Sequence, residues 1–328
     1  MPVQPSSRDL PRQALVLTAG LGTRLRPLSY VRAKPAVPIA GEPLIRRIVK
    51  WLARHDVRDL VLNLHYKPGT ITRVLGDGSD IGARIRYSWE QPLLGSAGGP
   101  RHALPMLDDE FFIVNGDTLT DVDLVALARD HRAHGALVTM AVIENPKPAQ
   151  YGGVLLDEGG SITGFTLPRP GFRSCHFIGV QLTQAETFAD APDGTRMETV
   201  TELYPALLRS RPARLRAFHT AAAFFDVGTP ADYLATSHAV ARTEGLADLP
   251  PGRNTMIDST SRVAGTAIWD DVVIEPRCEI EDCVLGDNVT VRSGARYRHL
   301  AIVRATGLTA RPGERVDGDL LIAPISDL

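Results

Sequence analysis

The chain has 328 residues, enough for about two average domains of roughly 150 residues each. It carries 36 basic and 38 acidic residues, so its formal net charge of -2 provides no overall positive field for a nucleic acid. At 44% hydrophobic and 23% charged residues the composition is that of an ordinary folded protein, and no segment approaches the roughly 20 apolar residues of a membrane span. These features exclude an integral membrane protein and a disulfide-stapled mini-protein, and they predict no nucleic-acid or membrane partner.

The N-terminus and the cysteines favour a cytoplasmic protein. Residues 1–12 are polar and rich in proline, and the apolar run that follows is too short for the core of a signal peptide. Three cysteines cannot form a disulfide framework, and Cys278 and Cys283 are not spaced as metal ligands. We therefore expect residues 1–12 to be a flexible leader of a protein in the reducing cytoplasm.

Short apolar runs alternate with helical patterns in the first half of the chain. Residues 14–19 are an apolar run closed by glycine, as expected for a buried strand that leads into a loop. After Pro43, apolar residues recur at three- and four-residue spacings, which predicts a helix before the apolar strand at residues 60–64. Residues 111–115 predict a further strand that ends just before Asp117. The alternation predicts an α/β fold with a doubly wound, mainly parallel sheet, whose ligands gather beyond the carboxyl ends of the strands.

The following region is less regular. A helix is expected from Asp121, with Gly135 as its stop. Glycine and proline separate short strand-like runs over residues 140–225, which indicates antiparallel additions to the sheet. Thr229 is a good N-cap and is followed by proline, so a helix is predicted over residues 230–244.

The periodicity changes after residue 245. Aliphatic residues then recur every six positions, with five-residue steps between sets: Ile257, Val263, Ile268, Ile274, Ile280, Leu285 and Val291. Such hexapeptide repeats are typical of a parallel β-helix, with a plain β-meander as the alternative. The sequence thus predicts an α/β domain at residues 12–245, a linker at 246–252, and a β-helix with a C-terminal tail at 253–328.

The loop after the first strand carries glycines and cations. Residues 20–28 read GLGTRLRPL, and glycines in such a loop let backbone N–H groups approach phosphate oxygens. A dinucleotide fingerprint would need a glycine at Leu25, and a Walker loop would need Gly-Lys-Ser/Thr, so neither motif is present. Arg24 and Lys34 add positive charge nearby. Cations beside a phosphate cradle suit a reaction in which a triphosphate loses pyrophosphate.

This loop resembles the signature of the sugar-1-phosphate nucleotidyltransferases, Gly-x-Gly-Thr-Arg-Leu-x-Pro-Leu followed by Lys-Pro. Residues 20–28 and 34–35 match it. The resemblance continues at residues 94–99 (LGSAGG), which are similar to the family's base-recognition loop, at 115–117 (NGD) and at 225–230 (FDVGTP). Together with the repeats it covers nearly the whole chain. It implies the nucleotide-diphospho-sugar transferase type of α/β fold, with a short C-terminal left-handed parallel β-helix.

The resemblance implies a role for each matching residue. Arg24, Lys34 and Asp117 correspond to the catalytic set, and Asp117 with Asp226 corresponds to the pair that holds Mg²⁺. Independently, Asp117 ends a strand and Asp226 follows an apolar run, so both are expected at one edge of the sheet, although Asp226 before Gly228 also reads as a turn residue. The implied nucleotide-binding residues are Ala19, Gly20, Gly22, Thr23, Gly95 and Ser96.

The sugar-phosphate site departs from the family pattern. The family often carries Glu-Lys-Pro here, whereas residues 166–170 read TLPRP. Either Arg169 replaces the family's lysine, or it is a loop residue and the sugar phosphate is bound otherwise. Gly152 and Gly179 fall in stretches that resemble sugar-contacting segments, where glycine permits close approach of a hexose, and simple strand bends are the alternative.

Two further patterns are better explained structurally. Asp121 and Asp123 imitate the Asp-x-Asp of metal-dependent glycosyltransferases, but they stand at the start of a predicted helix, where carboxylates cap and complement the dipole. His299 near the repeats is reminiscent of acyltransferases on longer β-helices, but about three coils are too few for such a site.

The resemblance implies a nucleotidyltransferase that makes an NDP-sugar and pyrophosphate from an NTP and a sugar 1-phosphate. Residues 94–99 and the coil start at 268–271 (IWDD) look most like guanylyltransferases, so GTP, mannose 1-phosphate and Mg²⁺ are the expected substrates and cofactor. Uridylyl- and thymidylyltransferases share the catalytic residues and stay as alternatives. A catalytically silent NDP-sugar-binding paralogue is disfavoured by the intact catalytic residues, and a glycosyltransferase has no need of this loop.

The β-helix is expected to serve in assembly. Each coil covers its neighbour's core and cannot end bare, so residues 253–328 are predicted to cap the repeat or to form a homo-oligomer contact. Because all the implied site residues lie upstream, the sequence predicts that a chain without residues 253–328 still binds NTP.

Overall fold

The computed structural model describes residues 10–325, so the first nine residues of the expected leader lie outside the described residues. Of the described chain, one compact unit takes residues 10–20, 47–68 and 75–225, and a second takes residues 21–46, 69–74 and 226–325. We call them unit 1 and unit 2. The contacts therefore group residues 21–46 with the C-terminal coils, a grouping that the predicted boundaries did not anticipate.

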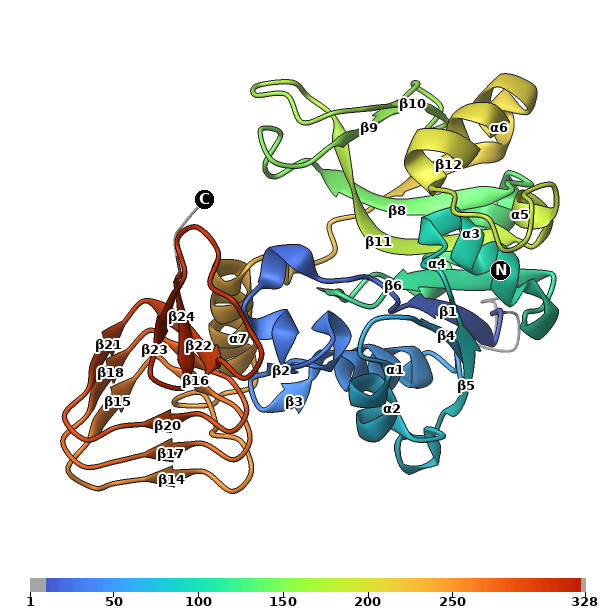
Figure 1. Ribbon diagram of the computed structural model, residues 1–328. Helices are drawn as coiled ribbons and strands as arrows, with labels where there is room; N and C mark the ends of the chain where they lie inside the picture. The colour runs from blue at the N-terminus through green and yellow to red at the C-terminus, as the bar shows by residue number, and fades with distance from the viewer. Residues whose placement is uncertain (1–9, 326–328) are drawn as a thin grey trace. The chain divides into compact units, whose positions relative to one another are not determined.

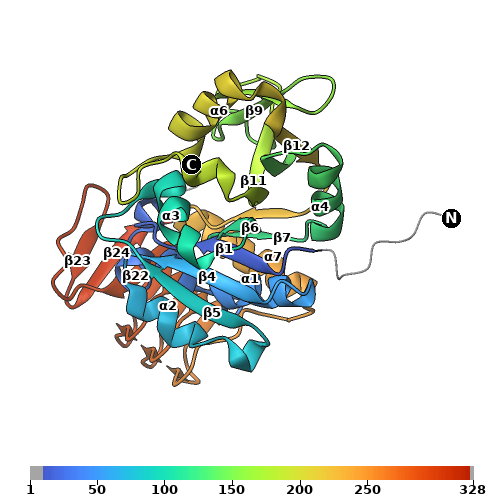
Figure 2. The same ribbon diagram turned by 90° about the vertical axis from the view of Figure 1, so that its right-hand side faces the viewer.

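Unit 1 contains a mixed sheet. Its nine strands within the described residues are β1 (Gln13–Leu17), β4 (Asp59–Leu64), β5 (Arg84–Trp89), β6 (Glu110–Asn115), β8 (Val138–Glu144), β9 (Gly153–Leu156), β10 (Ile162–Thr166), β11 (Cys175–Gln184) and β12 (Leu215–His219). The order is β10-β9-β11-β6-β1-β4-β5, and β8 pairs with both β11 and β12. Figure 2 shows β6, β1, β4 and β5 side by side. These four strands are parallel, as predicted.

The other half of the sheet is largely antiparallel, as the irregular pattern over residues 140–225 indicated. Strand β11 runs antiparallel to β6, β8 and β9. Strand β12 is parallel to β8. The expected mainly parallel sheet is therefore correct for β6, β1, β4 and β5, which form one end of the sheet, and the sheet as a whole is mixed.

Helices alternate with these strands along the chain. They are α1 (Leu44–Arg54), α2 (Pro68–Leu75), α3 (Gly95–Ala103), α4 (Leu124–Ala133), α5 (Glu186–Ala189) and α6 (Tyr204–Ser210). Helix α3 contacts β1 and β4, and α4 contacts β8, β11 and β12. The helix expected to open at Pro43 begins one residue later, because Pro43 belongs to a short hairpin of β2 (Pro38–Ile39) and β3 (Glu42–Pro43). Helix α4 ends before Gly135, which has the left-handed φ of 56° expected of a stop.

Unit 2 begins with three short 3-10 turns and later contains a long helix. The turns are η2 (Thr23–Leu25), η3 (Leu28–Tyr30) and η4 (Lys34–Ala36). Helix α7 (Pro230–Thr243) starts with a capping box: Thr229 Oγ1 accepts from the Asp232 backbone N–H, and the Asp232 carboxylate accepts from the Thr229 N–H. The predicted helix at residues 230–244 is confirmed within one residue.

The rest of unit 2 is a stack of coils. The chain visits three parallel ladders in turn: β14 (Met256–Ile257), β17 (Val273–Ile274) and β20 (Thr290–Val291); β15 (Arg262–Ala264), β18 (Glu279–Glu281) and β21 (Arg296–Arg298); β16 (Ala267–Ile268), β19 (Val284–Leu285) and β22 (Leu300–Arg304). Figure 1 shows these coils in orange and red. Paired residues are 17 positions apart, so each coil takes 17 residues, as the six- and five-residue steps indicated. We call residues 253–304 the coil stack.

The interior and the corners of the coil stack explain its sequence pattern. Five of the repeat residues fill a buried core together with Cys278 and Cys283: Ile268, Ile274, Ile280, Leu285 and Val291. Val263 packs against this core, and Ile257, in the first coil, is exposed. Asp282 and His299 occupy equivalent corners with left-handed φ values of 49° and 52°, so His299 is a corner residue. A hairpin of β23 (Arg315–Asp317) and β24 (Leu320–Pro324) continues the last ladder and covers the end of the core. None of the helices in residues 10–325 has the length and apolarity that crossing a membrane requires.

Candidate active site

In unit 1, three predicted site residues emerge at one edge of the sheet. Strands β1 and β6 are parallel neighbours, and the Gly116 N–H donates to the Leu17 carbonyl oxygen at 2.9 Å. A Cβ at residue 116 would lie 2.7 Å from that oxygen, so the turn before Asp117 requires glycine. Ala19 and Gly20 follow β1 at this edge, and Asp117, half-buried, follows β6.

A buried carboxylate that the sequence analysis missed anchors the predicted base-recognition loop. Glu90 follows β5, accepts from Asn63 Nδ2 at 2.7 Å, and accepts from the Leu94 N–H at 2.9 Å. A Cβ at Gly99 would collide with Glu90 Oε1, which explains one of the loop's glycines. The signal was a glutamate directly after β5, at the same edge as the other candidates.

Gly95 and Ser96 begin helix α3. Gly95 has a left-handed φ of 78°, and the Ser96 backbone N–H and Oγ donate to Glu198 Oε2 at 3.0 and 2.7 Å. The Thr199 N–H donates to Ser96 Oγ at 2.9 Å. A carboxylate at the positive end of the helix dipole is stabilising. The Ser96 side chain therefore holds the loop in place, and its contact with a nucleotide stays a prediction.

The residues expected to contact the sugar have structural partners of their own. A Cβ at Gly179, where φ is 81°, would lie 3.0 Å from the Asn115 Cβ, so glycine lets β11 pass the end of β6. A Cβ at Gly152 would lie 2.9 Å from the Thr166 carbonyl oxygen. Arg169 is exposed and stacks on Phe172, with 5.2 Å between its Cζ and the ring centroid. Their sugar-binding roles stay predictions.

Three aromatic rings in unit 1 form a cluster that sequence reasoning missed. The rings of Tyr151 and His176 stack with centroids 4.4 Å apart, and Phe224 meets His176 edge-on at 4.8 Å. Burial lowers the pKa of His176, so this ring is neutral at pH 7. The three residues come from distant segments, so local sequence carried no signal of their meeting.

In unit 2, Arg24, Lys34 and Asp226 form a charged group that we call the Asp226 cluster. Lys34 Nζ lies 3.8 Å from Asp226 Oδ1, and Arg24 Nη1 lies 4.0 Å from Asp226 Oδ2. The Lys34 side chain is 8% exposed and that of Asp226 13%, whereas that of Arg24 is 61% exposed. One carboxylate between two cations leaves net positive charge, as expected of a phosphate-binding group.

Glycines allow the Asp226 cluster to close up. Gly22 has a φ of 60°, and a Cβ there would lie 3.2 Å from the Lys34 Cβ. A Cβ at Gly228 would lie 2.9 Å from Asp226 Oδ2 and 3.1 Å from Arg24 Nη1. Both glycines of the predicted motifs therefore allow the backbone to lie close to the charged side chains of the Asp226 cluster. Thr23, also predicted to bind nucleotide, is exposed next to Arg24.

Each of the two aspartates predicted to hold Mg²⁺ has the donor chemistry that this ion prefers. Asp117 and Asp226 are partly exposed carboxylates, the oxygen donors that Mg²⁺ prefers. No group of three or more His, Cys, Asp or Glu with metal-site geometry occurs within residues 10–325. Mg²⁺ typically takes one or two carboxylates and completes its shell with phosphate oxygens and water, so two are sufficient. Because Asp117 and Asp226 belong to different units, their convergence stays a prediction.

The Asp-x-Asp pattern near residue 121 has the structural role expected for one of its aspartates. Asp123 caps α4 and accepts from the Val125 and Ala126 backbone N–H groups at 2.9 and 3.0 Å. Asp121 was also expected to cap the helix, but it does not. It accepts instead from the Ala223 N–H at 2.7 Å and so ties down the chain just before β13 (Phe224–Asp226).

Comparison with known proteins identifies the class. Residues 13–243 match the family model described as nucleotidyl transferase. The chain is 29% identical over 294 residues to the mannose-1-phosphate guanylyltransferase of Mycobacterium tuberculosis. The match covers 86% of this chain and 81% of that protein. It is 27% identical to the UTP–glucose-1-phosphate uridylyltransferase of Synechocystis, over 80% of this chain and 72% of that protein.

A solved structure shares the fold. The crystal structure of HddC from Yersinia pseudotuberculosis matches with a TM-score of 0.61 at 23% identity, over 70% of this chain and 99% of that chain. This chain belongs to the nucleotidyl transferase family. The family and the enzyme class predicted from residues 20–28 and 34–35 are thereby confirmed.

Proposed function

We propose that this chain transfers the guanylyl group of GTP to mannose 1-phosphate and forms GDP-mannose and pyrophosphate. Sugar-1-phosphate nucleotidyl transfer is the reaction class predicted from the sequence, and the curated relatives agree with it. The guanylyltransferase relative from Mycobacterium tuberculosis supports the choice of substrates. The observation that carries the proposal is the Asp226 cluster, which places a lysine and an arginine around one carboxylate directly after a glycine loop.

The proposed reaction is a single in-line displacement. An oxygen of the sugar phosphate attacks the α-phosphorus and forms a new P–O bond, while the bond from the α-phosphorus to the β-phosphate oxygen breaks. Pyrophosphate leaves with that electron pair, and no general base is needed because the attacking oxygen is already anionic. Lys34 and Arg24 bind the β- and γ-phosphates and stabilise the negative charge that grows on them, which is the largest kind of catalytic contribution.

Asp226 keeps the two cations in place before substrate arrives. With the lysine side chain 8% exposed, an uncompensated ammonium would be costly to bury. We propose that Asp117 and Asp226 hold Mg²⁺. When bound, the ion would supply positive charge that offsets the negative charge of the phosphate oxygens. Binding a triphosphate then releases both cations from Asp226 onto the substrate.

The remaining predicted residues have roles that the resemblance implies. We propose that Ala19, Gly20, Gly22 and Thr23 approach the phosphates with their backbone, and that Gly95 and Ser96 face the base. The resemblance further implies contacts of Gly152, Arg169 and Gly179 with the sugar phosphate.

The coil stack supports the predicted architecture and assembly. We propose that it is a left-handed parallel β-helix and that it joins copies of the chain into a homo-oligomer. Support comes from its first strand, β14, where Met256 and Ile257 are exposed apolar residues on a short edge strand. The proposed compartment is the cytoplasm, in keeping with the three free cysteines.

The test is a substrate matrix. The purified chain is incubated with Mg²⁺, each of GTP, UTP, dTTP, ATP and CTP, and a panel of sugar 1-phosphates, and pyrophosphate release is followed. The fastest release is expected from GTP with mannose 1-phosphate. Faster release with UTP or dTTP and a glucose phosphate would replace the substrates, and binding of an NDP-sugar without release from any pair would indicate the silent paralogue.

A further inference from the structure

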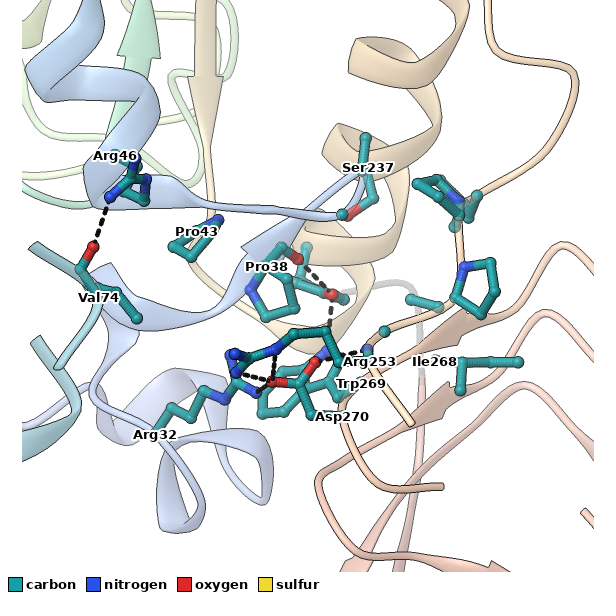
Figure 3. Close-up of a pocket in the computed structure, with 18 of the residues that line it drawn as sticks. Arg32, Pro38, Pro43, Arg46, Val74, Ser237, Arg253, Ile268, Trp269 and Asp270 are labelled. Carbon is teal, nitrogen blue, oxygen red and sulfur yellow. Dashed lines mark hydrogen bonds and ion pairs between the residues drawn. The ribbon is translucent and has the colours of Figure 1, made fainter. Parts of the chain in front are cut away.

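The segment that carries Lys34 is tied to the coil stack through Arg32. Arg32 Nε donates to Asp287 Oδ2 at 2.7 Å, and Nη2 donates to Asp287 Oδ1 at 2.6 Å, which makes a bidentate pair. Nη2 also donates to Asp270 Oδ2 at 2.9 Å, the contact that Figure 3 shows. Asp270 and Asp287 are 17 positions apart, at equivalent places of successive coils, so one guanidinium joins two coils.

This contact is shielded from solvent. The side chains of Arg32, Asp270 and Asp287 are 12, 17 and 16% exposed. Burial lowers the pKa of Arg32, but Asp287 and Asp270 more than reverse this effect, so the net pKa lies above the ordinary value. The Arg32 Cζ lies 5.4 Å from the Trp269 ring centroid, within range of a cation–π contact. A shielded, multiply bonded guanidinium fixes its own backbone far better than an exposed ion pair does.

A second chain of hydrogen bonds links the coil stack to the same segment on the C-terminal side of Lys34. Trp269 is fully buried, and its Nε1 donates to the Tyr233 hydroxyl at 2.8 Å. The Tyr233 hydroxyl in turn donates to the Pro38 carbonyl oxygen at 2.6 Å. Lys34 therefore lies between two anchors, Arg32 and Pro38, that both lead to residues 269–270 of the coil stack.

The same network reaches the residue that pairs with Lys34. Tyr233 is on α7, and the N-cap of that helix, Thr229, comes three residues after Asp226. One turn along the helix, Thr236 Oγ1 donates to the Asp226 carbonyl oxygen at 3.4 Å. The coil stack thus braces both partners of the Lys34–Asp226 pair.

We propose that Asp270 and Asp287, acting through Arg32, are positioning residues that fix Lys34 for the transfer of the nucleotidyl group. The inference rests on the proposed function and adds to it a use for the coil stack in catalysis. A misplacement of about 1 Å at a catalytic group can lower a rate by about a hundredfold, so bracing of this kind has a measurable effect. None of these three residues needs to touch substrate.

The first test compares two arginines that share one carboxylate. Arg253 also donates to Asp270 Oδ2, at 2.8 Å, but its side chain is 83% exposed and it belongs to the coil stack, not to the segment that carries Lys34. Arg32→Ala is expected to lower kcat about tenfold to a hundredfold. The control Arg253→Ala is expected to keep the wild-type kcat. Equal losses in the two variants would show that the coil stack needs these ion pairs for stability alone and would overturn the proposal.

The second test asks whether the effect passes through Lys34. In a Lys34→Ala background, removing Arg32 is expected to cause little further loss, because the group it positions is already absent. If the loss of kcat in the double variant equals the product of the losses in the two single variants, the proposal is overturned. Arg32 also lines a cavity of about 410 Å³, so millimolar guanidinium chloride has access to the vacated site and is expected to restore part of the Arg32→Ala activity. It is expected to have no such effect on Lys34→Ala.

Two provisions keep the outcomes distinct. If Arg32→Ala is insoluble, Asp287→Asn takes its place with the same expected fall in kcat, and an unchanged kcat in that variant counts against the proposal. If the wild type turns over no pair in the substrate matrix, the proposed function fails, and the positioning role is then decided by NTP affinity. Arg32→Ala should bind NTP severalfold more weakly than Arg253→Ala, and equal affinities would overturn it.

Discussion

Lys34 is a buried cation whose Nζ lies 3.8 Å from the Asp226 carboxylate, and this pair defines the chemistry at the scale of single residues. Removing one partner of a buried pair is more harmful than removing both, because the other charge stays without compensation. Asp226 therefore has two tasks: it holds Lys34 before substrate binds, and by the resemblance it also holds the metal ion.

We predict that Asp226→Asn and Asp117→Asn each lower turnover by about a hundredfold or more, since a carboxylate on a catalytic metal contributes several kcal/mol. The amide keeps the volume of the side chain but loses its charge, so the melting temperature should change little for Asp117→Asn. The measurement is initial pyrophosphate release at saturating Mg²⁺. Asp123→Asn is the matched control, because asparagine caps a helix as well as aspartate does. Wild-type turnover in both substituted enzymes would refute the metal assignment.

Single residues with a local motif were predictable, and those defined by tertiary contacts were not. Arg24, Lys34 and Asp226 were selected from short motifs, and the structure brings these three together. Glu90 and Arg32 were missed. Glu90 becomes important only because Asn63, on a neighbouring strand, meets it, and Arg32 because its two carboxylates lie more than 200 residues further along the chain.

At the scale of elements, helix α3 shows how a glycine-rich sequence can form a helix despite its low propensity. Its interior glycines lie against other parts of unit 1, and a Cβ at Gly98 would collide with the Thr195 carbonyl oxygen. The packing requires these glycines, and Glu198 compensates the start of the helix through its contacts with Ser96. Tertiary contacts therefore override the local preference.

We predict that Gly99→Ala destabilises the protein by about 1–3 kcal/mol, because the added methyl group has to displace the buried Glu90 carboxylate. NTP affinity should fall in parallel, since the loop of Gly95 and Ser96 begins the same helix. Denaturant unfolding and nucleotide titration measure the two effects. Gly69→Ala is the control: it lies in α2 with nothing within 4 Å of the added Cβ, and is expected to be neutral or to stabilise by up to about 1 kcal/mol. Equal stabilities of the two variants would contradict the packing account.

Element types were predicted well where the periodicity was strong. The 17-residue coils and the capping box of α7 follow directly from spacing and cap chemistry. The antiparallel character of residues 140–225 was indicated, but the pairing was not, because β11 reads as an ordinary apolar strand and nothing local specifies that it lies beside β6. Pairing of this kind depends on contacts between segments distant in sequence.

At the scale of the molecule, the chain interleaves its two units. Residues 21–46 leave the sheet of unit 1 and join α7 and the coil stack in unit 2. The predicted boundaries divided the chain at a proline-rich linker, which is where composition changes. They could not show that the loop carrying Lys34 depends on residues 269–287, because that dependence rests on Arg32 and on the Tyr233 hydroxyl.

This interleaving changes the expected result of truncation. The sequence alone predicts that a chain without residues 253–328 keeps its NTP site. In the structure that deletion removes Trp269, Asp270 and Asp287 together, leaves Arg32 without either carboxylate, and takes from Tyr233 its partner Trp269. We therefore predict that the truncated chain loses most of its NTP affinity. Its oligomeric state, measured by light scattering, should also change.

A shorter deletion separates the two effects. Removing residues 305–328 takes away the hairpin of β23 and β24 but keeps Asp270 and Asp287. This variant should retain NTP affinity, while exposure of the apolar edge of β22 lowers its solubility. Nucleotide titration and light scattering on both chains give the answer. If the chain without residues 253–328 binds NTP as tightly as the full chain, then Lys34 holds its position without the coil stack, and the bracing described for unit 2 has no part in substrate binding.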